Sequence, residues 1–143
     1  MQIVLREMKS DDAEAVMLLS KQLGYDISLP ETQNNIEALI EQGDNKTFVA
    51  ELENEVLGWV SIAYTISLES LPFCEIRGLI VDKKYRKNSI GKMLVEKARQ
   101  WCREKNCSRL RVRTNIKRTD THAFYLHLGF TEKKEQKVFD ANV

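Results

Sequence analysis

One stretch in the second half of the chain limits the possible folds more than any other. An apolar segment, Leu79–Val81, runs into a short charged loop, and an amphipathic segment begins after Ser89. The apolar face of that segment has helical spacing and consists of Ile90, Met93, Leu94, Ala98, Trp101 and Cys102. A further strand is expected over Cys107–Thr114. Strand, helix and strand in this order predict two parallel strands joined by a right-handed crossover.

The rest of the chain predicts antiparallel strands and further helices. Apolar runs predict strands over Ile3–Leu5, Thr47–Leu52, Val56–Ile66 and Phe73–Val81, and helical spacing predicts helices over Ser10–Gly24 and Pro30–Gln42. One or two final strands are expected from Thr131 onward. We therefore expect an α/β (α+β) fold: a mixed, mainly antiparallel twisted sheet of roughly six to seven strands with about four helices on both faces. With 143 residues, the chain has the size of one domain, residues 1–143.

The loop before the central helix has the composition of an anion site. Its residues are basic or small, namely Arg86, Lys87, Asn88, Ser89, Gly91 and Lys92. A helix start offers unpaired backbone N–H groups and a partial positive charge, and small residues let the backbone approach an anion closely. The stretch is not a P-loop, because Arg86 and Met93 stand where that motif needs a glycine and a hydroxyl residue. The composition indicates either a pyrophosphate site or an ordinary basic loop between strand and helix.

A second block, from Arg118 to Phe130, predicts a short late helix. Thr119 can cap its start, and Gly129 can end it in a left-handed turn. Together the two blocks resemble the GNAT N-acetyltransferase superfamily. Arg86-x-x-Ser89-x-Gly91 is similar to the (Gln/Arg)-x-x-Gly-x-(Gly/Ala) signature of that family, and the family's late helix is matched at Arg118, Phe124, Tyr125, Gly129 and Phe130.

The resemblance implies transfer of an acetyl group from acetyl-coenzyme A to a primary amine, which attacks the thioester directly in a ternary complex. It assigns the coenzyme pyrophosphate to Arg86, Lys87, Asn88, Ser89, Ile90, Gly91 and Lys92. Backbone groups of Leu79, Ile80 and Val81 would hold the pantetheine arm, and the Leu79 N–H would stabilise the charge that develops on the thioester oxygen. Tyr125 would protonate the leaving thiolate, because a phenol with a pKa of about 10 is protonated at neutral pH.

Further residues of the implied site have two interpretations each. Glu75 is either the general base for the amine or the partner of Arg77 in a simple surface ion pair. Asn115 either bonds the pantetheine, as a family asparagine does, or forms a turn. His122 is either a contact of the coenzyme arm or a solvated or capping histidine. The resemblance also implies that Arg118, a matched residue of the late helix, binds the coenzyme.

Ser89 is a departure from the family signature, which has glycine at this position. Serine is strained there if the position needs a positive φ angle. Serine is suitable if the position needs only a small residue at a helix start, where its hydroxyl can bond a phosphate oxygen. We favour the second interpretation, because basic residues surround the position.

Composition excludes several classes of protein. A net charge of +1 argues against a dedicated nucleic-acid binder. A solvated or ion-paired strand face explains the alternation of Arg109, Arg111 and Arg113 more simply than a nucleic-acid patch does. No apolar run is long enough to span a membrane and no signal-peptide pattern is present, which suggests a cytoplasmic protein. No His/Cys set has zinc-ligand spacing, so no metal is expected. The three cysteines suit reduced thiols that are buried as small hydrophobes.

The acceptor is expected to be a small cationic amine, or a lysine side chain or N-terminus of a protein. Acidic residues such as Asp26, Glu31 and Glu69 would suit a cation. The alternative function is a non-catalytic acyl-CoA-binding sensor or partner-binding module, which would need no proton donor such as Tyr125. An exposed strand edge near the C-terminus would allow two copies to pair as a homodimer.

Overall fold

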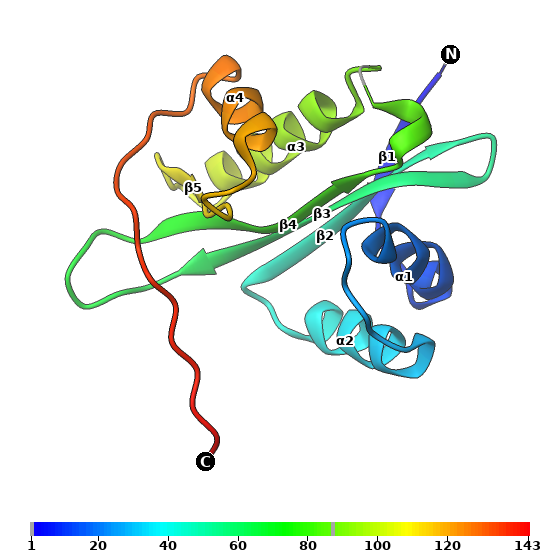
Figure 1. The fold of residues 1–143 in the computed structure, drawn as a ribbon, viewed down its shortest axis with the longest axis horizontal. Coiled ribbons are helices and arrows are strands. Elements are labelled where there is room, and N and C mark those ends of the chain that lie inside the picture. The colour runs from blue at the N-terminus through cyan, green and yellow to red at the C-terminus, as the bar shows by residue number, and fades with distance from the viewer. Residues whose placement is uncertain (1, 87) are drawn as a thin grey trace. The chain divides into compact units, whose positions relative to one another are not determined.

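The structure is a computed structural model that describes residues 2–86 and 88–143. Lys87, which belongs to the predicted pyrophosphate site, lies outside the described residues. The chain divides into two compact units, residues 1–112 and 113–143. The first contains β1 (Val4–Glu7), α1 (Ala13–Lys21), α2 (Leu29–Glu41), β2 (Asn45–Leu52), β3 (Glu55–Thr65), β4 (Phe73–Val81), α3 (Ile90–Glu104) and β5 (Leu110–Val112), and the second contains α4 (Thr119–His127) (Figure 1).

The strands form a sheet in the order β1–β2–β3–β4–β5. Neighbours from β1 to β4 pair antiparallel, and β5 runs parallel to β4 after the crossover through α3. This confirms the predicted class and the mixed, mainly antiparallel sheet. Within the described residues the sheet has five strands, not the predicted six or seven, because residues 131–143 form neither helix nor strand. The charged run Glu132–Lys137 explains the difference, since it has no alternating apolar face to bury.

Helices cover both faces of this sheet, as neighbouring residues of β3 show. A Cβ atom added at Gly58 would lie 3.2 Å from Leu94 Cδ1, so α3 packs directly against the backbone at this glycine. The next residue, Trp59, packs on the opposite side against the core cluster of Met8, Ala13, Val16, Ile36 and Val49. Figure 1 accordingly shows α1 and α2 on one side of the sheet and α3 on the other.

Strand β4 contains a β-bulge at Arg77. Ser61 of β3 pairs with Gly78, whereas the next residue, Ile62, pairs with Ile76. Arg77 lies between these two pairs and has no register partner on β3, so it is the extra residue of the bulge. A bulge bends its strand and turns one side chain out of the regular alternation. Ile76 is accordingly buried while Arg77 is exposed.

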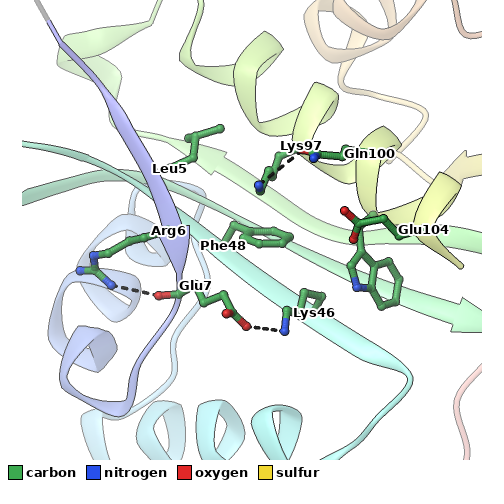
Figure 2. Close-up of a pocket in the computed structure, with 9 residues that line it drawn as sticks. Leu5, Arg6, Glu7, Lys46, Phe48, Lys97, Gln100 and Glu104 are labelled. Atoms are coloured by element: carbon green, nitrogen blue, oxygen red, sulfur yellow. Dashed lines mark hydrogen bonds and ion pairs between the residues drawn. The ribbon is translucent and has the colours of Figure 1, made fainter.

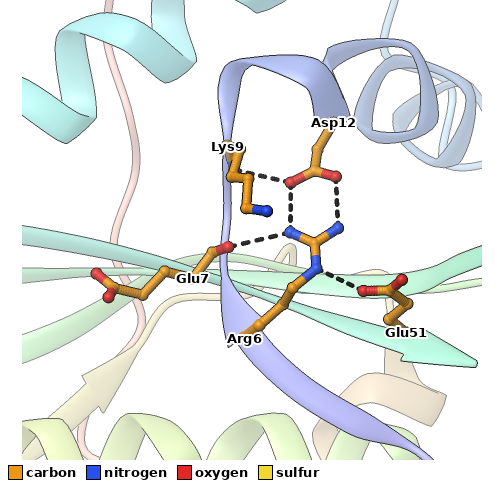
Figure 3. A network of polar contacts seen from close by, with 5 residues as sticks. All are labelled: Arg6, Glu7, Lys9, Asp12 and Glu51. Atoms are coloured by element: carbon orange, nitrogen blue, oxygen red, sulfur yellow. Dashed lines mark hydrogen bonds and ion pairs between the residues drawn. The ribbon is translucent and has the colours of Figure 1, made fainter. Parts of the chain in front are cut away.

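A polar network joins β1 to β2 and to the start of α1 (Figure 3). The Arg6 guanidinium donates to both carboxylate oxygens of Asp12, at 2.9 and 2.8 Å, and also pairs with Glu51. The backbone N–H of Lys9 donates to the same Asp12 carboxylate at 2.7 Å. Burial favours the neutral form of Asp12, but these donors outweigh it and hold the pKa of Asp12 below its usual value.

Candidate active site

The loop that leads from β4 to α3 is fixed at its start by two other elements. The N–H of Asp82 donates to the carbonyl of Leu57 on β3 at 2.8 Å. The N–H of Lys83 donates to the side-chain oxygen of Gln22, just after α1, at 3.0 Å. The backbone therefore leaves the sheet in a defined direction before it reaches Arg86.

Helix α3 begins with backbone donors that point out of the helix end. Its first backbone bond runs from the N–H of Met93 to the carbonyl of Ser89, at 3.0 Å. The N–H groups of Ile90, Gly91 and Lys92 precede that bond and have no acceptor within the helix. Ser89 is the N-cap residue, yet its hydroxyl makes no capping hydrogen bond in the described part of the chain. The helix start is thus positively polarised and offers donors to an anion.

The side chains around this helix start agree with such a site. Arg86, Asn88 and Lys92 are exposed, so solvent and ligands can reach their polar groups. Ile90 is buried against the sheet and can offer only its backbone N–H to a ligand. The predicted pyrophosphate residues therefore surround one helix terminus, although Lys87 lies outside the described residues.

The favoured interpretation of Ser89 is wrong about its backbone. Ser89 has φ 65° and ψ 9°, which is the left-handed region. An L-residue with a Cβ atom is disfavoured there by about 1–2 kcal/mol. Glycine in the family signature thus meets a conformational requirement, and serine occupies this position under strain. Ser89 is exposed, so a ligand can still reach its hydroxyl.

The far edge of β4 is open next to this helix start. β4 pairs with β5 only at Cys74, Glu75 and Ile76. From Arg77 onward, no described strand pairs with that edge, whereas the other edge pairs with β3 as far as Val81. An open edge can hold an extended ligand by backbone hydrogen bonds, as an added strand would. The predicted pantetheine residues, Leu79–Val81, thus form the end of β4 from which the chain continues to the predicted pyrophosphate site.

Glu75 lies on β4 just before the bulge and is buried. Its Oε1 accepts from Nε of Arg77 at 3.0 Å, while the Arg77 side chain is 55% exposed. The ion-pair interpretation is therefore correct about the contact but wrong about its place, because the carboxylate is inside the protein. Arg111 of β5 stands beside Glu75 in the parallel register. Glu75 is thus a buried carboxylate on β4, paired with an exposed guanidinium at the bulge.

The second unit holds the remaining predicted residues around α4. The side chain of Asn115 accepts from the N–H of Lys117 at 2.9 Å, which is the contact of a turn, one of its two interpretations. Nε2 of His122 lies 2.9 Å from the carbonyl oxygen of the same Asn115. This contact closes the turn that precedes α4, and a contact of His122 with the coenzyme stays a prediction. Arg118 is the N-cap residue of α4.

Tyr125 is buried on α4 between two aromatic rings. The rings of Phe124 and Phe130 lie 5.0 and 5.2 Å from it, both edge to face. The N–H of Phe130 donates to the carbonyl of Tyr125 at 3.0 Å, and Gly129 has φ 92°, so the predicted left-handed helix end is confirmed. Burial raises the pKa of Tyr125 to about 12, against a smaller opposing effect of Arg118. The phenol is therefore protonated at neutral pH.

Comparison with known families decides the identity of this arrangement. The model of the acetyltransferase (GNAT) family matches residues 6–130, which is most of the chain and extends over both units. The chain belongs to the GNAT acetyltransferase family. The protein is therefore an acyltransferase with the fold and the coenzyme-dependent chemistry of that family, as the resemblance implied.

Individual relatives of this GNAT acetyltransferase are similar in sequence or in fold. An uncharacterized N-acetyltransferase of Chlorobaculum tepidum is 29% identical over 92% of this chain and 77% of its own length. The aminoglycoside acetyltransferase AAC(6')-Iy, solved with a bisubstrate analogue of coenzyme A and acetylneamine, has a TM-score of 0.88 at 18% identity, with 100% of both chains covered. A transcriptional regulator of Bacillus halodurans has a TM-score of 0.88 at 21% identity, with 98% and 100% covered.

A cavity of about 430 Å³ lies away from the predicted site of the GNAT acetyltransferase (Figure 2). It opens between β1, β2 and α3, over the ring of Phe48. The Lys97 ammonium lies 5.2 Å from the centre of that ring, and Lys46 pairs with Glu7 at the rim. Sequence reasoning missed this cavity, because its residues come from three separate elements and form no motif.

The described residues also bear on metals, membranes and the arginine strand. They contain no group of three or more His, Cys, Asp or Glu side chains that could hold a metal ion. None of their helices is both long and apolar enough to cross a membrane. The guanidinium groups of Arg109 and Arg111 lie 5.7 and 4.3 Å from the ring centre of Phe73. These arginines therefore make cation–π contacts with an aromatic ring, which strand alternation alone did not predict.

Proposed function

We propose that this GNAT acetyltransferase transfers the acetyl group of acetyl-CoA to a primary amine, which attacks the thioester directly in a ternary complex. The observation that carries the proposal is the open edge of β4 at 77–81, which leads to the positively polarised start of α3. An extended arm that ends in a pyrophosphate fits such an edge and helix terminus. Because the family model matches residues 6–130, we also propose that residues 1–143 work as one domain.

The coenzyme is held mainly by backbone groups. In the proposed complex, Leu79, Ile80 and Val81 bond the pantetheine, while the pyrophosphate accepts from the N–H groups of the α3 start. Charged and polar side chains complete the coenzyme site: Arg86, Lys87, Asn88, Ser89, Lys92, Asn115, Arg118 and His122. AAC(6')-Iy was solved in complex with a bisubstrate analogue that contains coenzyme A. This complex supports a coenzyme site in the fold.

The reaction needs three groups. The amine nitrogen attacks the thioester carbon, and the Leu79 N–H donates to the oxygen as negative charge develops on it. The carbon–sulfur bond then breaks, and Tyr125 gives its proton to the leaving thiolate. Its pKa of about 12 supports this role, since the phenol holds a proton at neutral pH. Glu75 accepts the proton of the amine, directly or through water.

The acceptor is proposed to be a small cationic amine, or a lysine side chain or N-terminus of a protein. The acetylneamine part of the AAC(6')-Iy ligand supports the first class. Asp26 and Glu69 are exposed acids that suit a cation. Glu31 is removed from this set, because it is engaged with Ser28 in the capping box of α2, with hydrogen bonds of 3.1 and 3.2 Å.

The alternative function, a non-catalytic acyl-CoA sensor, has one observation in its favour. The structure of a transcriptional regulator from Bacillus halodurans shares the fold. Both functions require coenzyme binding, but only the enzyme requires a proton donor at Tyr125. An activity measurement on a Tyr125 variant therefore separates them.

Calorimetric titration with acetyl-CoA tests the coenzyme site first. Reversal of charge in Arg86→Glu is expected to weaken binding by about 10–100-fold, the scale of one hydrogen bond to a charged group. Arg103→Glu is the matched control, because Arg103 is exposed at the other end of the same helix. Equal affinity of wild type and both variants would refute the site.

Thiol release with a panel of amines then tests catalysis. The panel holds an aminoglycoside, a polyamine, a lysine peptide and a peptide with a free N-terminus. Amine-dependent release of coenzyme A by the wild type supports the enzyme. Binding of acetyl-CoA without release for any amine would favour the sensor.

A further inference from the structure

The three cysteines lie together at the C-terminal end of α3. The predicted coenzyme site is at the opposite end of this helix. Cys102 lies in the last turn of α3, Cys107 lies in the loop that follows, and Cys74 lies on β4. Cys74 and Cys102 are buried, whereas Cys107 is partly exposed. All three are free thiols within the unit of residues 1–112.

The helix end brings Cys102 and Cys107 together. Asn106 has φ 58°, and its N–H donates to the carbonyl of Arg103 at 2.9 Å. The N–H of Cys107 donates to the carbonyl of Cys102 at 3.0 Å. These two bonds define a Schellman motif, which is frequently accompanied by a contact between the side chains of the third-last helical residue and of the second residue beyond the cap. Here both side chains are thiols.

The side chain of Cys102 reaches the residue beyond the helix end. Sγ of Cys102 lies 3.6 Å from the carbonyl oxygen of Cys107, and the side chains of the two cysteines interact. Two neighbouring thiols are the starting point for a disulfide bond.

Cys74 completes the cluster from the sheet. Its backbone N–H donates to the carbonyl of Arg109 at 3.0 Å, and Sγ of Cys102 donates to the same carbonyl at 3.4 Å. Burial raises the pKa of Cys74 and of Cys102, so both rest as protonated thiols at neutral pH. Only Cys107 is accessible from solvent.

We propose that this cluster is a reversible thiol-modification site, in which a low-molecular-weight disulfide converts Cys102 and Cys107 into a disulfide across the end of α3. The Cys107 thiolate attacks one sulfur of the small disulfide, whose S–S bond breaks and releases one thiolate that takes up a proton. Cys102 then loses its proton to solvent and attacks Sγ of Cys107, which releases the second small thiol. Two protein thiols are oxidised, and one small disulfide is reduced to two thiols.

The test counts and locates thiols after incubation of the full-length protein with oxidised glutathione, or with the disulfide of coenzyme A in a second arm. Acid quenching, alkylation and intact-mass measurement are expected to show one alkylated cysteine, a loss of two hydrogen atoms and no adduct. Trypsin cleaves after Arg103 and Lys105, so a Cys102–Cys107 disulfide joins two separate peptides. Reaction in one arm only would identify which small disulfide the site accepts.

Three variants make the result decisive. Cys102→Ser is expected to retain the small thiol as an adduct on Cys107, and Cys107→Ser is expected to keep both remaining thiols reduced. Cys74→Ser is the control and should still form the disulfide. Cys102→Ala, with its melting curve, replaces Cys102→Ser if that variant does not fold. Three alkylated cysteines in the oxidised wild type, or a disulfide that includes Cys74, would overturn the proposal.

Discussion

Replacement of Ser89 by glycine tests the most specific departure of this chain from its family. Ser89 has φ 65° and ψ 9°, where an L-residue is disfavoured by about 1–2 kcal/mol. Glycine removes that strain but adds about 0.5–1 kcal/mol of backbone entropy to the unfolded chain. We therefore expect Ser89→Gly to raise the free energy of unfolding by about 0.5–1 kcal/mol, because burial and capping bonds of the Ser89 side chain do not oppose the change.

Urea unfolding followed by tryptophan fluorescence measures this effect. Trp59 and Trp101, the two tryptophans of the chain, both lie in residues 1–112 and so report on the unit that contains Ser89. The melting temperature should rise by roughly 1–4 °C. A change of 1 kcal/mol shifts the melting temperature by about 2–4 °C in a slightly larger chain and by about 4–8 °C in a smaller one.

Two control variants separate strain from other effects of the substitution. Ser89→Ala removes the hydroxyl but keeps the Cβ atom, so it should bring no stabilisation. Ser108→Gly introduces glycine at an exposed serine that has no positive φ, and it should leave stability unchanged or lower it. If Ser89→Gly is no more stable than the wild type, or if Ser89→Ala gains as much, the strain argument is refuted.

Three other changes have expected outcomes. A Cβ atom at Gly78 would lie 2.6 Å from the ring of Trp59, so Gly78→Ala should cost about 1–3 kcal/mol in urea unfolding, and Trp59→Phe in the same chain should reduce that cost. Asp12 has a lowered pKa in the folded state, so its stabilising contribution is present above about pH 4 and is lost as the pH falls through the folded pKa. Unfolding measured from pH 7 to pH 3 should show a steeper acid decline for the wild type than for Asp12→Asn, and equal declines would contradict this. Tyr125→Phe should lower thiol release by about 10²–10⁴-fold with unchanged acetyl-CoA affinity, whereas full activity would remove Tyr125 from the mechanism.

Sequence reasoning predicted those parts of the fold that depend on periodicity and on helix ends. The amphipathic pattern after Ser89 predicted α3, and Gly129 predicted the end of α4, because both follow from local physics. The prediction of strands after Thr131 is wrong, because this segment lacks the periodic apolar pattern on which the other predictions rested. Val138 and Phe139 are isolated apolar residues in a charged segment, and two such residues do not provide a face that a sheet can bury.

The candidate site was predictable in its residues but not in its backbone. The resemblance identified the loop from Arg86 to Lys92, because a motif records which residue types are used. It did not reveal the φ angle of Ser89, since serine is common both at helix starts and in turns. It also did not place Glu75 inside the protein, because a carboxylate is almost never fully buried unless it is paired. Burial of that group depends on the residues packed around β4.

The open edge of β4 follows from the bulge at Arg77. The last pair between β4 and β5 joins Ile76 to Val112, and the bulged residue comes directly after it. β5 ends at Val112, and an extra residue bends β4 and increases its local twist directly after that last pair, so the parallel ladder stops where the bulge begins. One signal of this was present in the sequence, since Gly78 is an isolated glycine inside a strand pattern, which is typical of a bulge or of a close approach. Gly78 shows both features, because it follows the bulge and lies under the ring of Trp59. The bulge at Arg77 therefore marks the point beyond which the backbone groups of Leu79–Val81 have no described strand partner on this edge of β4.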